Sequence, residues 1–258
     1  MIGTRMTILT RTPPAAHIRL AYGSHDLQFG DLRLPDRPPP WPVTIVIHGG
    51  FWRARYDLEH IGHLCAALTE QAGTATWSLE YRRVGQPGGG WPGTLQDVAA
   101  GTNFVSQLAS EYPFDLERTV TIGHSAGGQL ALWAASETKL PRGAVSLAGV
   151  ADMRYAADLR IGNAAVQDFL GGEPADVPER YVAASPFERL PLGVSHVLVH
   201  GTDDDTVPFE IAERYLKAAK SAGDEVRLVG LERTGHFELI DPLSDAWPAV
   251  REAVESLL

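Results

Sequence analysis

The chain alternates short runs of apolar and β-branched residues with longer segments of helical periodicity. Apolar runs of four to eight residues are typical of strands buried on both faces. Strands that alternate with helices favour right-handed crossovers and a mostly parallel sheet covered by helices on both faces. The pattern therefore predicts an α/β fold. Its core strands are expected at residues 43–47, 74–79, 119–122, 144–147, 194–199 and 226–229.

The segments between these runs carry apolar residues every three to four positions, as amphipathic helices do. Helices are expected at residues 58–71, 98–112, 129–137, 210–222 and 245–258. Pro248 is compatible with the last of them because it falls in the first turn. Cys65, the only cysteine, lies on the apolar stripe of the first helix and is expected to be a buried core residue. Residues 20–34 are expected to add antiparallel strands at the edge of the sheet.

One segment, residues 151–190, interrupts the alternation with several glycines and prolines and only short helical patterns. A chain of 258 residues fits a single α/β domain, so residues 1–258 are expected to form one domain. Inserts at the carboxyl ends of strands shape the ligand crevice in such folds. Residues 151–190 are therefore predicted to form a cap or lid insertion. The alternative is a surface loop that does not contact the ligand.

The charge balance excludes some functions. The chain has 22 Lys and Arg against 32 Asp and Glu, a net charge of −10, and no basic cluster, so a nucleic-acid-binding surface is not expected. No apolar run approaches the roughly 20 residues of a transmembrane helix, so no membrane association is expected. The first twelve residues lack a continuous apolar core with a cleavage site, which predicts a cytoplasmic location rather than secretion.

The pentapeptide at residues 123–127, Gly-His-Ser-Ala-Gly, follows an apolar strand and leads into a helix. This is the context that the G-x-S-x-G motif of serine hydrolases requires. A sharp turn between strand and helix projects the hydroxyl of Ser125, and the helix N-terminus favours negative charge nearby. The pentapeptide predicts a nucleophilic serine, with a purely structural turn as the alternative.

A second loop, His48-Gly49-Gly50-Phe51-Trp52, follows the strand at 43–47. Glycines in such a loop let backbone N–H groups approach a developing oxyanion. The expected donors are the N–H groups of Gly50 or Phe51, together with that of Ala126. His48 is expected to brace the loop through hydrogen bonds.

Two further loops follow late strands. One holds three adjacent carboxylates, Asp203, Asp204 and Asp205, and the other holds His236. One carboxylate is expected to orient a histidine, and the others are expected to be solvated. His236 is placed to reach Ser125 over the edge of the sheet.

The chain order serine, aspartate, histidine resembles that of the α/β-hydrolase superfamily, and the resemblance extends from His48 to the final helix. It implies a mostly parallel central sheet with helices on both faces and a short cap-like insertion. Alignment with the family's D-x-x-V-P stretch implies that Asp204 is the acid, with Asp203 and Asp205 as alternatives.

Within the superfamily, residues 48–52 resemble the H-G-G-x-W motif of the kynurenine formamidase (arylformamidase) group. The pentapeptide, His236-Phe237-Glu238, and Gln28 with Asp31 point the same way, and small carboxylesterases share these features. The resemblance implies a serine hydrolase that cleaves a small carboxylic ester or aryl formamide through an acyl-enzyme. Ser125, Asp204 and His236 would be its catalytic residues, and it would need no metal or other cofactor.

Glu80-Tyr81-Arg82 resembles the D-Y-R stretch of hormone-sensitive-lipase-like esterases, with glutamate replacing aspartate. Because a guanidinium neighbours the carboxylate, this stretch is expected to be a structural ion pair.

The substrate is the least constrained feature. Trp52, Trp91 and Phe169, with Phe51, are expected to line an aromatic-friendly substrate pocket, although each could equally belong to the core. The expected partner is a small-molecule ester or amide. A homodimer is a further expectation, because hydrophobic edge segments of this fold often associate.

Other functional classes remain as alternatives. Glu59-His60 and His63 share a helix face, which would suit a metal hydrolase, but no third ligand accompanies them at a recognisable spacing. Peptidases, lyases and perhydrolases use the same fold, so the reaction type is open. A non-catalytic binding protein on a hydrolase fold is the alternative furthest from an enzyme.

Overall fold

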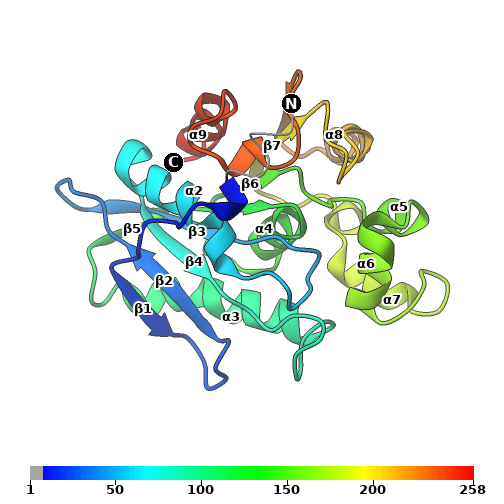
Figure 1. Ribbon diagram of the computed structural model, residues 1–258, viewed down its shortest axis with the longest axis horizontal. Helices are drawn as coiled ribbons and strands as arrows, with labels where there is room; N and C mark the ends of the chain where they lie inside the picture. Colours follow the sequence, from blue (N-terminus) through cyan, green and yellow to red (C-terminus); the bar gives the residue numbers. More distant parts are fainter. Residues whose placement is uncertain (1–7) are drawn as a thin grey trace.

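A computed structural model describes residues 8–258. Residues 1–7, on which the prediction of a cytoplasmic location mostly rests, lie outside the described residues. An eight-stranded sheet forms the centre, in the order β1-β2-β4-β3-β5-β6-β7-β8 (Figure 1). The strands are β1 (Ile18–Ala21), β2 (Phe29–Arg33), β3 (Trp41–Ile47), β4 (Ala75–Leu79), β5 (Phe114–His124), β6 (Gly143–Leu147), β7 (Ser195–Gly201) and β8 (Val226–Leu231).

The strand directions match the prediction of a mostly parallel sheet. β1 pairs with β2, and β2 with β4, in antiparallel fashion, whereas all pairs from β4 to β8 are parallel. The expected antiparallel edge strands within residues 20–34 are therefore confirmed. Because the strands from β3 to β8 are parallel, the loops after their carboxyl ends all meet at one edge of the sheet.

Helices cover both faces of the sheet (Figure 1). On one face α2 (Gly62–Ala67) and α9 (Trp247–Glu255) pack against the strands, and Cys65 is fully buried there, as expected. On the other face lie α3 (Gly93–Leu108), α4 (Ala126–Glu137) and α8 (Glu210–Ala222). No helix among the described residues is both long enough and apolar enough to cross a lipid bilayer.

The helix expected at residues 58–71 is divided into three kinds of turn. A 3₁₀ turn, η1 (Leu58–Ile61), precedes α2, and a π-helical turn, η2 (Leu68–Ala72), follows it. The side chain of Asp57 caps the first turn by accepting from the N–H of Glu59. Gly73 ends the last turn in the left-handed conformation. Apolar periodicity places the helical face correctly but does not detect these local changes in winding.

Residues 151–190 leave the sheet after β6 and return to it at β7. They form α5 (Met153–Asp158), α6 (Ile161–Leu170), α7 (Pro178–Ala184) and η3 (Pro186–Arg189). The three α-helices group together at one side of the molecule, next to α4 (Figure 1). Near the C-terminus, η4 (Glu238–Ile240) is a single 3₁₀ turn.

Candidate active site

Ser125 occupies the turn between β5 and α4. Its φ and ψ are 60° and −122°, a backbone conformation that costs a non-glycine residue about 1–3 kcal/mol. The close packing of the turn explains the glycine at 123, where a Cβ would lie 2.0 Å from the carbonyl oxygen of Gly127. A strained turn between a strand and a helix is the setting that presents a nucleophilic serine in this class of motif.

Asp204 and His236 meet across two loops that follow β7 and β8. Nδ1 of His236 donates to Oδ2 of Asp204 at 2.7 Å. The other carboxylate oxygen accepts the backbone N–H groups of Thr206 and Val207, each at 2.8 Å. The carboxylate is thus held in place by the turn that follows it, and it fixes the tautomer of His236 with Nε2 available to accept a proton.

The structure distinguishes Asp204 from its two neighbours. The Asp204 side chain is fully buried, whereas Asp203 and Asp205 are exposed. Burial alone would raise the pKa of the Asp204 carboxyl, but hydrogen bonds from His200 and His236 outweigh it and hold this pKa well below its usual value. Asp204 is therefore the one of the three carboxylates placed to orient His236.

His124, the second residue of the pentapeptide, joins the two loops. Its Nε2–H donates to the backbone carbonyl of His236 at 2.9 Å, and the two rings lie 4.4 Å apart. Burial lowers the pKa of His124 well below its usual value, so the ring stays neutral. The strand end that carries Ser125 is thereby tied to the loop that carries His236.

Ser125 and His236 line the same small cavity, which has a volume of about 40 Å³. Most of its wall is apolar or aromatic. The residues around it are Leu9, Gly50, Phe51, Tyr56, His60, His124, Ser125, Thr206, His236 and Phe237. The cavity thus brings the predicted nucleophile, the predicted base and the glycine loop after β3 to one place.

The glycine loop passes directly beside Ser125. A Cβ on Gly49 would lie 2.5 Å from the carbonyl oxygen of His124 and 3.0 Å from Cβ of Ser125. Phe51 and Trp52 both have positive φ, 58° and 55°. Among the described residues, the backbone N–H groups of Gly50, Phe51 and Ala126 donate no hydrogen bond to another backbone carbonyl. These backbone groups are thus free to act on a ligand at Ser125.

His48 anchors this loop to the core, as the sequence predicts. Its ring lies flat against Tyr81, with ring centres 4.3 Å apart, and its Nε2 contacts Oε1 of Glu80 at 3.1 Å. Glu80 also accepts the backbone N–H groups of Tyr81 and Leu58. Burial would raise the pKa of the Glu80 carboxyl, but its interactions with His48 and Arg83 hold it below its usual value.

Glu80 forms an ion pair, as expected, but the prediction that Arg82 is its partner is wrong. Glu80 pairs with Arg83 at 3.2 Å, and Arg82 pairs with Asp97 at 2.6 Å. After β4 ends, Arg82 turns toward α3, where Asp97 is fully buried. Adjacent positions in the sequence therefore serve two separate ion pairs.

Most of the chain matches one known protein family. The model described as BD-FAE matches residues 31–218, which include the glycine loop, Ser125 and Asp204. The chain belongs to the BD-FAE family.

Known relatives of this BD-FAE family member carry esterase names. "Probable isoprenylcysteine alpha-carbonyl methylesterase ICME" of Oryza sativa subsp. japonica is 24% identical over 261 residues, covering 92% of this chain. The match spans 62% of that relative's length.

Two solved structures share the fold across nearly the whole of both chains. A truncated carbohydrate esterase from gut microbiota matches with a TM-score of 0.80 at 19% identity, covering 96% of this chain and 99% of that one. The propionate-bound esterase Est2 of Thermogutta terrifontis matches with a TM-score of 0.75 at 24% identity, covering 95% and 94%. The fold is the α/β-hydrolase fold.

The three aromatic residues expected to bind substrate lie elsewhere in this BD-FAE family member. Trp52 and Phe169 are each 1% exposed and stack on one another, with ring centres 4.8 Å apart. Trp52 also donates to Oε1 of Gln129. Trp91 lines a separate cavity with Trp133 between α3 and α7. Trp52 and Phe169 pack against one another in the core, and none of the three side chains lines the cavity at Ser125, so their role in substrate binding stays a prediction from the sequence.

Arg53 fastens the glycine loop to residues 160–164. In that segment Gly162, Asn163 and Ala164 all have φ near 60°, which costs a non-glycine residue about 1–2 kcal/mol. The Arg53 guanidinium donates to the carbonyls of Gly162 and Asn163, at 2.7 and 2.9 Å, and pairs with Asp168 at 2.6 Å. The left-handed segment is thus held by the residue that follows Phe51 and Trp52 in the chain.

The residues considered for a metal site have other contacts. Nδ1 of His60 faces the carbonyl of Asp57, and Nε2 of His63 faces the carbonyl of Arg11. The described residues contain no group of three or more side chains suited to hold a metal ion. His60 instead lines the cavity at Ser125. Leu9 and Tyr56 line it too, and no local sequence motif marks either of them.

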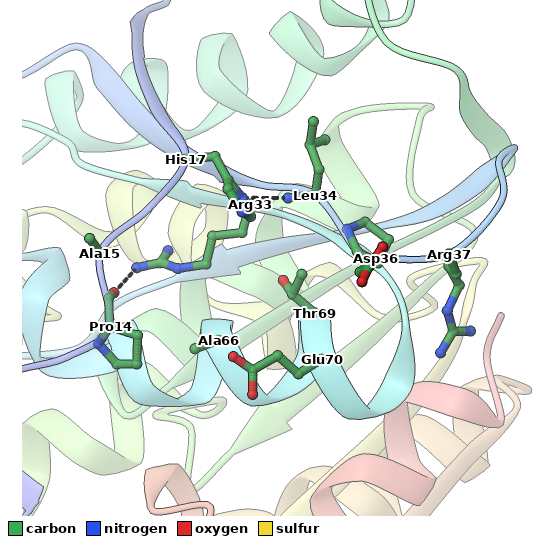
Figure 2. Close-up of a pocket in the computed structure, with 11 residues that line it drawn as sticks. Pro14, Ala15, His17, Arg33, Leu34, Asp36, Arg37, Ala66, Thr69 and Glu70 are labelled. Atoms are coloured by element: carbon green, nitrogen blue, oxygen red, sulfur yellow. Dashed lines mark hydrogen bonds between the residues drawn. The ribbon is translucent and has the colours of Figure 1, made fainter.

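A larger cavity, about 320 Å³, is lined by residues of the N-terminal segment, β2, α2 and η2 (Figure 2). Arg33 borders it, opposite Thr76 near the beginning of β4, whereas Ser125 follows the carboxyl end of β5. The Arg33 guanidinium donates to the carbonyl of Pro14 at 2.9 Å and so braces the N-terminal segment. The wall of this cavity contains no serine or cysteine, so the smaller cavity is the candidate active site.

Glu80, which contacts both His48 and Arg83 beneath the glycine loop, is expected to contribute strongly to stability. Changing Glu80 to alanine leaves Arg83 buried without its ion-pair partner, which we expect to lower the free energy of unfolding by about 3–5 kcal/mol. Urea denaturation would measure the loss. Changing the exposed Glu213 to alanine provides a matched control, with an expected effect within about 0.5 kcal/mol. A loss below about 1 kcal/mol at Glu80 would contradict the role given to this carboxylate.

Proposed function

We propose that this chain is a serine esterase that hydrolyses small carboxylic esters through an acyl-enzyme intermediate. The observation that carries the proposal is the 2.7 Å contact of His236 with Asp204, made by a histidine that lines one cavity with Ser125. The esterase names of the relatives support the same activity.

In the proposed acylation, His236 takes the proton of the Ser125 hydroxyl as the oxygen attacks the ester carbonyl. Asp204 stabilises the imidazolium that forms, and its own buried position keeps the ring oriented. The negative oxygen of the tetrahedral intermediate accepts hydrogen bonds from the N–H of Gly50 or Phe51 and from that of Ala126. His236 then gives its proton to the leaving alcohol.

Deacylation repeats these roles with water as the nucleophile. His236 removes a proton from the water, which attacks the acyl carbon, and Ser125 leaves with the returned proton. Apart from this water, the groups that act in both steps are side chains or backbone N–H groups of this chain.

The shape of the cavity bears on the acyl group. Its volume of about 40 Å³ and its apolar wall favour a short acyl chain over a long one. The Thermogutta esterase with the same fold has propionate bound, which agrees with a short acyl group. An aryl formamide, implied by the resemblance of residues 48–52 to formamidases, is the second candidate substrate. The cytoplasmic location, the homodimer and the lid role of residues 151–190 stay predictions from the sequence.

Turnover of matched substrates tests the proposal. We would measure kcat/KM for p-nitrophenyl acetate and for N-formylkynurenine. A value near 10⁴ M⁻¹s⁻¹ or above for the ester, the lower end for true enzyme–substrate pairs, is expected, with a much smaller formamide value. The reverse order would assign the chain as a formamidase. Negligible turnover of both would overturn the proposed hydrolase.

A further inference from the structure

His60 lines the cavity at Ser125 but has no part in the proposed acyl transfer. It lies near the end of η1, and its ring centre is 5.9 Å from that of His48 and 6.0 Å from that of His124. It therefore sits between the brace of the glycine loop and the residue that precedes Ser125.

The backbone fixes the tautomer of His60. Nδ1 lies 3.0 Å from the carbonyl oxygen of Asp57, and because a carbonyl can only accept, Nδ1 carries the proton. Asp57 is itself held, since its side chain caps η1. The remaining nitrogen, Nε2, is then a lone-pair acceptor. None of the hydrogen bonds among the described residues uses it.

The charge state of the ring agrees with this assignment. Burial, followed by the nearby charge of His48, lowers the pKa of His60 to about 4, with a smaller contribution from His236. The ring is neutral at the pH where a histidine acts as a general base, so its Nε2 accepts rather than donates.

The ring nitrogens of His236 and His124 are unavailable to a substrate hydroxyl because they are used elsewhere or buried. His236 uses Nδ1 for Asp204 and needs Nε2 for the proton of Ser125. His124 uses Nε2 for the carbonyl of His236, and its Nδ1 is sealed inside the protein. His60 thus adds a neutral acceptor to a wall that is otherwise mostly apolar.

We propose that Nε2 of His60 accepts a hydrogen bond from a hydroxyl group of the substrate, so that the enzyme prefers hydroxyl-bearing esters over isosteric esters with a methyl group instead. This inference rests on the proposed esterase function and narrows its substrate class. A buried acceptor that is left without a hydrogen bond costs free energy, so a site of this kind strongly rejects an analogue that lacks the hydroxyl. An apolar site rejects an added hydroxyl much more weakly.

Two pairs of isosteric esters place the hydroxyl on either side of the scissile bond. On the acyl side, p-nitrophenyl glycolate is compared with p-nitrophenyl propionate. On the alcohol side, 2-hydroxyethyl acetate is compared with propyl acetate. Hydrolysis of these two esters is measured by titrating the released acid in a pH-stat. For each pair, the preference is the ratio of the two kcat/KM values. The preference of the wild type is then divided by the preference of each variant, so that intrinsic differences in ester reactivity cancel.

Changing His60 to phenylalanine keeps an aromatic ring but removes the acceptor. We expect it to lower the preference for the hydroxyl-bearing ester in one pair by about tenfold or more. Changing His60 to glutamine, which places an amide oxygen near the position of Nε2, should retain most of the preference. Changing His63 to phenylalanine is the matched control, because His63 does not line the cavity, and it should leave both ratios unchanged.

Wild-type ratios in the His60→Phe enzyme, within about twofold for both pairs, would overturn the inference while leaving the esterase intact. If the wild type turned over none of the four esters, the proposed function itself would fail, and the inference with it. Thermal melts of both His60 variants would confirm that the ratios come from folded protein.

Discussion

Changing Ser125 to alanine is expected to lower kcat/KM for p-nitrophenyl acetate by a factor of about 10⁴ or more. The hydroxyl is the only group of the protein that forms a covalent bond to the substrate in the proposed mechanism. The residual rate would come from binding and from the backbone donors of the glycine loop. The change should also abolish covalent labelling by a fluorophosphonate, which mass spectrometry of the labelled peptide would localise to Ser125 in the wild type.

The serine at position 110 offers a matched control. Ser110 is exposed after the end of α3, so changing it to alanine makes the same chemical change away from the cavity. Activity and labelling should stay at wild-type levels in that variant. Retention of more than about a tenth of the activity by Ser125→Ala would show that another group is the nucleophile.

Changing Asp204 to asparagine is expected to lower kcat by about 10⁴ while leaving KM nearly unchanged. Asp204 accepts hydrogen bonds from His236 and from two backbone N–H groups. An asparagine amide cannot accept at both ends, so it either donates toward His236, which reverses the tautomer, or meets the backbone donors with its own NH₂ group. Steady-state kinetics would separate the two constants.

The adjacent carboxylates make this test selective. Changing Asp203 or Asp205 to asparagine removes the same charge from the same loop, yet both side chains are exposed. We expect each of these variants to retain activity within about threefold of the wild type. An equally large loss at either position would show that the acid of the site had been misassigned.

The depressed pKa of Asp204 also affects stability. The carboxyl has a lower pKa in the folded protein than in the unfolded chain, so its ionisation stabilises the fold above about pH 4. This contribution is lost as the pH falls through the folded-state pKa. Asp204→Asn should therefore show a flatter decline of the free energy of unfolding in acid than the wild type.

Much of the architecture could be predicted because it depends on local patterns. The core strands are short runs rich in apolar or β-branched residues, and α8 begins and ends where its apolar stripe predicts. Ser125 and the glycine loop each directly follow a buried strand. Since the carboxyl ends of parallel strands share one edge, local motifs were enough to place them together.

The parts of the site that were missed depend on contacts between distant segments. Leu9 reaches the cavity from the N-terminal segment, and Tyr56 and His60 reach it from the connection to α2. Trp52 and Phe169 show where sequence leaves two interpretations open, because large aromatic side chains near a glycine loop suit a pocket and a core equally well. Only the packing of α6 on Trp52 distinguishes the two.

The link between Arg53 and the left-handed segment at 162–164 has a consequence for which substitutions the chain can tolerate. Arg53 and the Trp52–Phe169 stack join the glycine loop to α6, so a substitution within residues 160–164 is expected to shift the backbone of the glycine loop as well. Residues 160–164 and the loop beside Ser125 are therefore mechanically coupled, and they are expected to vary together rather than independently.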